Sequence, residues 1–183
     1  MTRIATLAFL VAVGAGSGAI ASAAAAELNV GDKAPDFALA ASDGKTYRLA
    51  DFKGKKAVVL AWFPKAFTGG CTVECKSLAA NGDKIRQYEV AYFMASVDPV
   101  EGEKGNKAFA ESEKADFPLL SDPTRETATA YGVVHPERGF AMRWTFYIDK
   151  DGKVAAIDKA VKPPTSAEDL LAKLAELKVP KAH

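Results

Sequence analysis

Cys71 and Cys75 are the residues whose type and spacing most directly suggest chemistry, and they are the two cysteines of a chain of 183 residues. A disulfide between cysteines only four residues apart would close a very small loop and would restrict the unfolded chain little. The spacing therefore favours a redox or metal-binding role over a structural bridge.

Cys71 follows a glycine-rich loop that comes after a strongly apolar segment, residues 57–63. A short apolar run of this kind predicts a strand covered on both faces. The residues after Cys71 have helical character, so we expect this cysteine in the first turn of a helix. Unpaired N–H groups and the helix dipole favour a thiolate there. The alternative, that Cys71 is a small packing residue, agrees less well with its polar, glycine-flanked neighbourhood.

Helical and extended patterns alternate along the chain. A second apolar run, residues 90–97, predicts another buried strand. Between the two runs, residues 71–89 predict a helix that breaks or kinks at Asn81-Gly82. Its expected core contacts are Leu78, Ile85 and Tyr88. Further helices are expected over residues 103–114 and 124–131.

The last third of the chain predicts a hairpin and a closing helix. Residues 144–148 and 154–157 flank the turn sequence Asp149-Lys150-Asp151-Gly152. The closing helix follows Pro163-Pro164, with Ser166 as its expected N-cap. Its leucines are expected in the core: Leu170, Leu171, Leu174 and Leu177. The whole pattern indicates an α/β domain with a central mixed sheet flanked by helices.

The first 26 residues have the pattern of a secretory signal peptide. A basic start at Arg3 is followed by an apolar run, Ile4 to Ile20, and by small residues ending near Ala26. We therefore expect one mature domain over residues 27–183, in the periplasm or secreted, without stable membrane association after processing. An uncleaved membrane anchor is the alternative, which the glycines within the run disfavour.

The charges of the chain are balanced. It has 24 basic and 23 acidic residues, and removal of Arg3 makes the two numbers equal. No basic block or aromatic-interleaved basic patch is present in the sequence. Nucleic acid is therefore not expected as a partner.

The segment Pro64-x-x-x-Thr68-x-x-Cys71 resembles the active-site signature of peroxiredoxins, the alkyl hydroperoxide reductase/thiol-specific antioxidant family. The flanking residues look most like the bacterioferritin-comigratory, or Q-type, subfamily. The similarity covers nearly the whole mature chain, at Val30–Phe37, Leu120–Pro123, Ala130–Val133 and Arg143–Asp149. The resemblance implies a thioredoxin-like fold and a thiol peroxidase that needs neither a cofactor nor a metal.

The resemblance also implies a role for each site residue. Cys71 would be the peroxidatic cysteine, and Thr68 would hydrogen-bond its thiolate and the bound peroxide. Pro64 would shield the site from water, and Arg143 would hold the thiolate form. Glu74 resembles a family carboxylate that orients arginine side chains, although an acid favoured by the helix dipole is an equally good interpretation.

Cys75 would complete the reaction by joining Cys71 in a disulfide after the sulfenic acid forms. Family members with a nearby partner usually place it five residues on, whereas the interval here is four. Residues four apart on a helix have Cβ atoms too distant for a disulfide, so the first turn would have to unwind. Alternatively, Cys75 is a core residue and an external thiol takes its place. The implied partners are a peroxide and an exported thioredoxin-like reductant, with the chain a monomer or weak dimer.

Two other functions use the same cysteines. A Sco-type copper protein also carries Cys-x-x-x-Cys, and His135 is the possible third ligand, although an exposed loop position is the simpler interpretation of this histidine. A thioredoxin-like thiol–disulfide oxidoreductase normally uses Cys-x-x-Cys and a proline where this chain has Met142-Arg143. The second histidine, His183, is the terminal residue.

Overall fold

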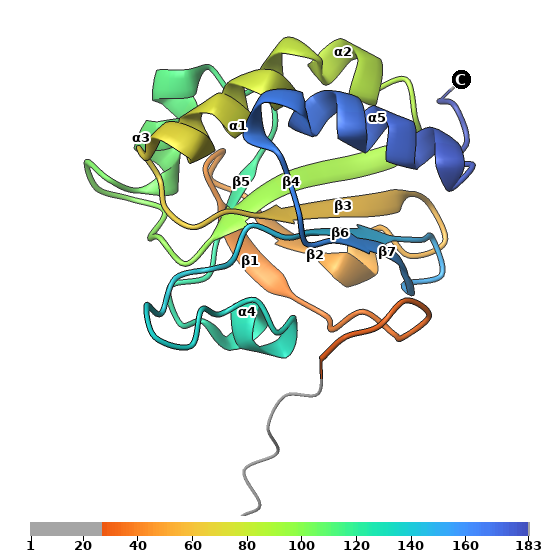
Figure 1. Ribbon diagram of the computed structural model, residues 1–183, viewed down its shortest axis with the longest axis horizontal. Helices are drawn as coiled ribbons and strands as arrows, with labels where there is room; N and C mark the ends of the chain where they lie inside the picture. The colour runs from red at the N-terminus through yellow and green to blue at the C-terminus, as the bar shows by residue number, and fades with distance from the viewer. Residues whose placement is uncertain (1–26, 183) are drawn as a thin grey trace, which may run out of the picture.

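The computed structural model describes residues 27–182, so the predicted signal peptide, residues 1–26, and His183 lie outside the described residues. Strands of these residues form one mixed sheet in the order β2-β1-β5-β4-β3-β6-β7 (Figure 1). The strands are β1 Ala38–Ala41, β2 Thr46–Arg48, β3 Ala57–Trp62, β4 Val90–Ser96, β5 Leu119–Ser121, β6 Thr145–Ile148 and β7 Val154–Asp158. The helices are α1 Gly69–Ala80, α2 Gly82–Ile85, α3 Asn106–Glu113, α4 Glu126–Ala130 and α5 Ser166–Glu176.

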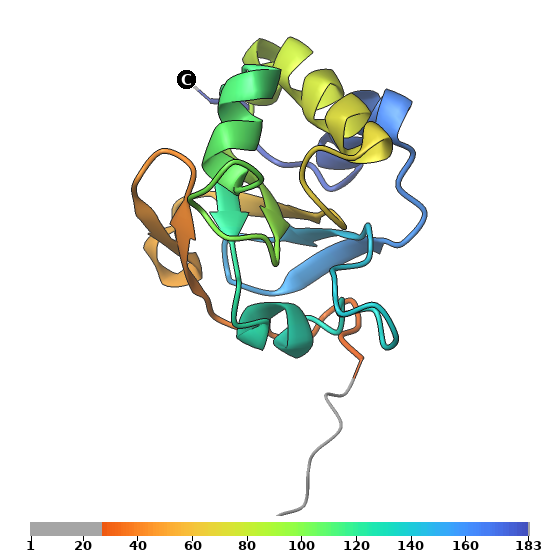
Figure 2. The same cartoon turned by 90° about the vertical axis from the view of Figure 1, so that its left-hand side faces the viewer.

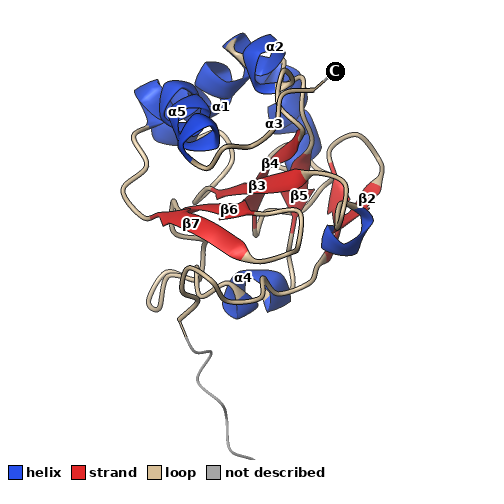
Figure 3. Ribbon diagram, turned by 90° about the vertical axis from the view of Figure 1, so that its right-hand side faces the viewer, coloured by secondary structure: helices blue, strands red, loops and turns tan. Residues whose placement is uncertain are grey.

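Helices cover both faces of the sheet in a three-layer arrangement. α1, α2, α3 and α5 lie on one face, and α4 lies on the other (Figures 1 and 3). Figure 2 shows the two helical layers on opposite sides of the strands, seen from the end that carries α3. Among residues 27–182, no helix combines the length and the apolar character needed to span a membrane.

The middle of the sheet explains why residues 57–63 are continuously apolar. β3 pairs in parallel with β4 and antiparallel with β6, and its Leu60 lies opposite Phe93 and Phe146. Alternate side chains of β3 enter two separate hydrophobic clusters, with Val59 on one face and Leu60 on the other. Because both faces are buried, the strand has no polar alternation.

Most predicted elements are confirmed. The two apolar runs form β3 and β4, the hairpin forms β6 and β7, and the helix after Cys71 is interrupted at Asn81. The helix ends at Ile85 rather than at residue 89, and Tyr88 is only partly buried. The other two predicted helices are shorter than expected, as α3 and α4.

The prediction for the N-cap of α5 is wrong by one residue. Residues Pro163–Thr165 first form a 3-10 turn, so Thr165 becomes the N-cap and Ser166 the first helical residue. The hydroxyl of Thr165 donates a hydrogen bond to Asp169 Oδ2 at 2.7 Å. Of the four predicted core leucines of α5, Leu170 and Leu174 are buried, and the other two are partly buried.

The parallel strands β3, β4 and β5 end at the same edge of the sheet, and β6, which is antiparallel to β3, begins there. The loop after β3, the start of α1 and the segment before β6 therefore meet at one edge. Carboxyl ends of parallel strands are where α/β folds build their sites.

Candidate active site

Cys71 is the third residue of α1, which begins directly after the loop that leaves β3. The N–H group of Phe63 still donates to the carbonyl of Ala95 at 2.9 Å, so the loop starts from a fixed point at the end of the β3–β4 pair. The side chain of Cys71 is fully buried, and the helix geometry leaves the N–H groups of its first turn without intrahelical acceptors. The predicted position of Cys71 in the first turn is therefore confirmed.

Arg143 brings a positive charge to the sulfur. It lies two residues before β6, and its Nη2 is 3.2 Å from the Sγ of Cys71. β6 is the antiparallel neighbour of β3, so the guanidinium reaches Cys71 across one strand spacing. Although burial lowers the pKa of Arg143, the charges of Glu74 and Cys71 raise it overall, which keeps the guanidinium charged.

Glu74 holds the other side of the same guanidinium. Its side chain is 1% exposed, and its Oε2 accepts a hydrogen bond from Arg143 Nη1. Burial raises the pKa of Glu74 to about 7, although the charge and hydrogen bond of Arg143 act in the opposite direction. The structure thus brings Cys71, Glu74 and Arg143 together, with the guanidinium in contact with both side chains.

Gly70 leaves room for this guanidinium, a requirement that we did not predict. A Cβ atom at Gly70 would lie 3.2 Å from Arg143 Nη2 and 3.8 Å from a side-chain carbon of Pro163. The Gly69-Gly70 pair was visible in the sequence as a loop signal. Nothing in the sequence indicated that the side chain of Arg143, 73 positions further along the chain, would approach Gly70 closely.

Pro64 and Thr68 belong to the loop, and the hydroxyl of Thr68 makes a different contact from the one expected. Pro64 is partly buried at the start of the loop, and Thr68 is the N-cap residue of α1. The Thr68 hydroxyl donates its hydrogen to the carbonyl oxygen of Lys65 at 2.9 Å, not to the sulfur. A hydroxyl has one hydrogen, so the predicted donation to Cys71 does not occur in this conformation. The lone pairs of Thr68 Oγ1 can still accept a hydrogen bond from a peroxide.

Cys75 lies one turn further along α1 and is fully buried in the core beneath the helix. Burial, together with the charges of Glu113 and Glu74, raises the pKa of its thiol to about 12. Both cysteines are free thiols on one uninterrupted helix. At neutral pH in this conformation, Cys75 is therefore a protonated core residue.

Asp98, just beyond the end of β4, contacts the loop from the inside and was also not predicted. Its Oδ2 accepts a hydrogen bond from the N–H of Ala66 at 2.8 Å, and its Oδ1 is 3.3 Å from Lys65 Nζ. A polar residue directly after an apolar strand was the available sequence signal. The contact itself joins residues 32 positions apart.

His135, the possible third copper ligand, makes its contacts within its own loop. Its Nδ1 accepts a hydrogen bond from the N–H of Glu137 at 3.3 Å, and its ring lies near Phe140. Within residues 27–182, no three His, Cys, Asp or Glu side chains are grouped as metal ligands would be. Among the residues that the structure describes, the copper interpretation therefore lacks a third ligand beside the two cysteines.

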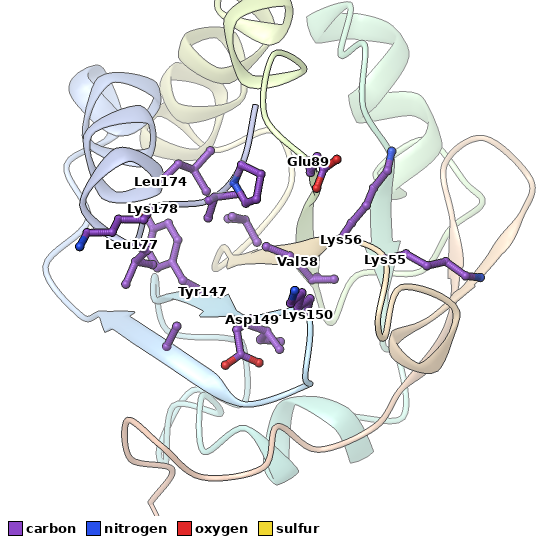
Figure 4. A pocket seen from close by; sticks show the side chains of 16 residues that line it. Lys55, Lys56, Val58, Glu89, Tyr147, Asp149, Lys150, Leu174, Leu177 and Lys178 are labelled. Carbon is purple, nitrogen blue, oxygen red and sulfur yellow. The ribbon is translucent and has the colours of Figure 1, made fainter. Parts of the chain in front are cut away.

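A cavity of about 290 Å³ lies at the opposite end of the sheet, where β3 begins (Figure 4). Its wall includes Val58, Tyr147 and Leu174, and charged residues such as Lys150 and Lys178 lie around it. None of the predicted site residues lines this cavity. The cavity is therefore separate from Cys71 and Arg143, which lie at the other end of the sheet.

The sequence matches the model of the AhpC/TSA family over residues 30–157. Peroxiredoxin Bcp of Escherichia coli K12 is 37% identical over 134 residues, which cover 69% of this chain and 83% of that protein. Alkyl hydroperoxide reductase E of Mycobacterium bovis is 35% identical over 144 residues, covering 78% of this chain and 91% of that protein.

Solved structures agree with these relatives. The crystal structure of peroxidoxin BcpB from Mycobacterium tuberculosis superposes with a TM-score of 0.74 at 30% identity, covering 82% of this chain and 98% of that chain. A mutant of Xylella fastidiosa PrxQ has a TM-score of 0.75 at 24% identity, with the same coverage, and so supports the thioredoxin-like fold. The chain therefore belongs to the AhpC/TSA family and is a peroxiredoxin, a thiol-dependent peroxidase.

Proposed function

We propose that Cys71 is the residue that attacks the peroxide and that Cys75 resolves the product. The observation that carries the first assignment is the contact of 3.2 Å between Arg143 Nη2 and Cys71 Sγ. A charged guanidinium beside a buried sulfur stabilises the thiolate, which is the nucleophilic form of cysteine. The substrates that fit this chemistry are hydrogen peroxide and organic hydroperoxides.

In the proposed first step, the thiolate of Cys71 attacks one peroxide oxygen in line. A sulfur–oxygen bond forms, the oxygen–oxygen bond breaks, and the leaving oxygen takes up a proton as water or an alcohol. Negative charge moves from the sulfur to the leaving oxygen. Arg143 and the N–H groups of Gly70 and Cys71 are the donors that can stabilise that charge. Thr68 Oγ1 can accept a hydrogen bond from the incoming peroxide. Pro64 limits the access of water.

The second step requires α1 to open. Cβ atoms four residues apart on a helix are about 5–6 Å from each other, whereas a disulfide needs about 3.5–4.5 Å. Gly69 and Gly70 make the first turn a weak part of the helix. Once this turn unwinds, the thiol of Cys75 leaves the core, attacks the sulfenic sulfur and releases water, which leaves a Cys71–Cys75 disulfide.

Two electrons from a dithiol donor would then restore both thiols. If the chain is exported, cytosolic reductant does not reach it, so we propose an exported thioredoxin-like donor. The proposed active unit is a monomer or weak dimer.

The test of this function is the reaction of the reduced protein with one equivalent of hydrogen peroxide. We expect wild-type protein to lose both thiols rapidly, because a disulfide consumes two, and to lose the mass of two hydrogens. Cys71→Ser should abolish the fast reaction. Cys75→Ser should retain the fast reaction, but the oxidation of Cys71 should stop at a sulfenic acid, seen as the added mass of one oxygen. Thiol titration and intact mass spectrometry provide both measurements.

A lone sulfenic acid in the wild-type protein would show that Cys75 is a packing residue and that an external thiol resolves Cys71. A slow reaction that Cys71→Ser leaves unchanged would contradict the assignment of the peroxidatic cysteine.

Arg143→Met should lower the second-order rate constant for peroxide by about 100- to 1000-fold, since it removes a charged donor aimed at the reacting atoms. Arg143→Lys should lower the rate constant less, because it keeps the positive charge. It should still lower it, because lysine lacks the planar fork that contacts Cys71 and Glu74 together. Stopped-flow measurement of Cys71 oxidation gives the rate constant. Arg138→Met, an exposed arginine of the preceding loop, is the matched control and should leave the rate unchanged.

Glu74 should impose a pH dependence on stability. Its pKa in the folded protein is about 7, above the ordinary 4.5, so the unfolded chain releases this proton first as the pH rises. The stability from Glu74 is therefore complete below pH 4.5 and is lost between pH 4.5 and 7, at up to about 1.4 kcal/mol per pH unit. Denaturant titrations of Glu74→Gln across this window should show a flatter dependence than wild type. An unchanged slope would mean that Glu74 does not lose its proton in this range.

We also propose that residues 1–26 are removed during export. Expression of the full-length chain in a Gram-negative host should yield a periplasmic protein whose intact mass begins at or near Glu27. Cell fractionation and mass spectrometry make this measurement, with a chain that starts at Glu27 as the cytoplasmic control. Recovery of the full-length mass in the membrane fraction would instead indicate an uncleaved anchor.

A further inference from the structure

We propose that Asp98 is a positioning residue of the peroxidase site, which fixes the course of the loop between β3 and α1. This inference rests on the proposed function of Cys71. Asp98 is outside the set of residues that the sequence motif singles out, and it lies on the segment after β4.

The side chain of Asp98 is buried, yet it is aimed at the loop. Its Oδ2 accepts the N–H of Ala66 at 2.8 Å, and this is a buried hydrogen bond. Its Oδ1 lies 3.3 Å from the ammonium group of Lys65, which remains largely exposed. A carboxylate thus contacts two consecutive loop residues, one through the backbone and one through the side chain.

The carboxylate is itself held in place by a buried polar network. Ser96 Oγ lies 3.1 Å from Asp98 Oδ2 and accepts the N–H of Asp98 at 3.1 Å. Asn106, at the start of α3, lies 3.2 Å from the same hydroxyl and donates to the carbonyl of Leu120 and to Ser121 Oγ. Side chains from β4, β5 and α3 therefore fix the orientation of Asp98. A buried polar network of this kind limits the motion of the carboxylate.

The loop that Asp98 holds has a conformation that it would not adopt alone. Phe67 has a φ of 59°, in the left-handed region, which is uncommon for a bulky side chain. The residue is 42% exposed, and its ring lies 5.2 Å from the ring of Phe109, which in turn lies 5.8 Å from the ring of Phe63. A strained residue of this kind persists only where its surroundings determine the backbone. Asp98 supplies that constraint at the preceding residue, Ala66.

The constraint reaches the reacting groups through the loop. The carbonyl of Lys65, one residue before the fixed N–H of Ala66, accepts the hydroxyl of Thr68. Thr68 in turn occupies the N-cap position of α1, whose first turn carries Cys71. Displacement of Ala66 would therefore move the Thr68 hydroxyl relative to the sulfur, while Arg143, which comes from another segment, would stay.

The experiment compares two reactions of Cys71 in the full chain: oxidation by hydrogen peroxide and alkylation by iodoacetamide. Oxidation depends on hydrogen-bonding groups placed around the peroxide, whereas alkylation depends on thiolate formation and access. Asp98→Ala should lower the oxidation rate constant by about 10- to 100-fold, since misplacement by about 1 Å can cost that much. The alkylation rate constant should change by less than about threefold, because Arg143 remains beside the sulfur. Both reactions are measured in proteins that also carry Cys75→Ser, so that Cys71 is the one thiol that can react.

Asp98→Asn should recover part of the oxidation rate, because an amide oxygen can still accept the N–H of Ala66. The matched control is Asp122→Ala. Asp122 is equally buried after a strand and accepts the N–H of Ala128 at 2.7 Å, but this bond holds the start of α4 on the other face of the sheet. Asp122→Ala should leave the ratio of the oxidation rate constant to the alkylation rate constant as it is in the parent protein.

Equal effects of Asp98→Ala and Asp122→Ala on this ratio would overturn the inference, as would parallel changes in both reactions. If Asp98→Ala does not fold, Asp98→Asn and Ser96→Ala carry the test, and both should lower the ratio. Failure of the proposed function would look different, since the parent protein itself would then show no oxidation of Cys71.

Discussion

The geometry of the site depends on the two contacts of the Arg143 guanidinium, one with the sulfur of Cys71 and one with the carboxylate of Glu74. An isolated charge buried at this depth would be unfavourable, and so would an isolated carboxylate. Each side chain offsets part of the other's cost, although burial still raises the pKa of Glu74 to about 7. Glu74 also fixes which way the planar fork faces, so that its second donor is directed at the sulfur.

The sheet topology makes this contact possible. Cys71 follows the end of β3, whereas Arg143 precedes the start of β6, and the two strands are antiparallel neighbours. The end of one and the start of the other therefore lie at the same edge. β4 is parallel to β3, so Asp98, which follows its end, reaches the same edge from the other side. Three segments distant in sequence thus converge without a long excursion of any loop.

Much of this arrangement could be predicted from local signals. The apolar runs predict β3 and β4, and the glycine-rich loop before a helical segment predicts Cys71 in the first turn. The strands β1, β2 and β5 are three or four residues long and are fixed by pairing with distant neighbours, so they leave little periodic signal. The space at Gly70 and the contact of Asp98 with Ala66 are tertiary features. The family motif points to Thr68, but not to the carbonyl of Lys65 that takes its hydrogen.

The same contacts connect the two proposed steps. While Cys71 is a thiolate, its attraction to Arg143 helps to hold the first turn of α1 closed, and Cys75 stays in the core with a pKa of about 12. Conversion to a sulfenic acid removes the negative charge and weakens that attraction. The turn that contains Gly69 and Gly70 then loses one of its few stabilising contacts, and Cys75 can be exposed and ionise. In the proposed mechanism, oxidation thus favours the opening that resolution requires, and the reduced protein keeps the helical geometry that the peroxide needs.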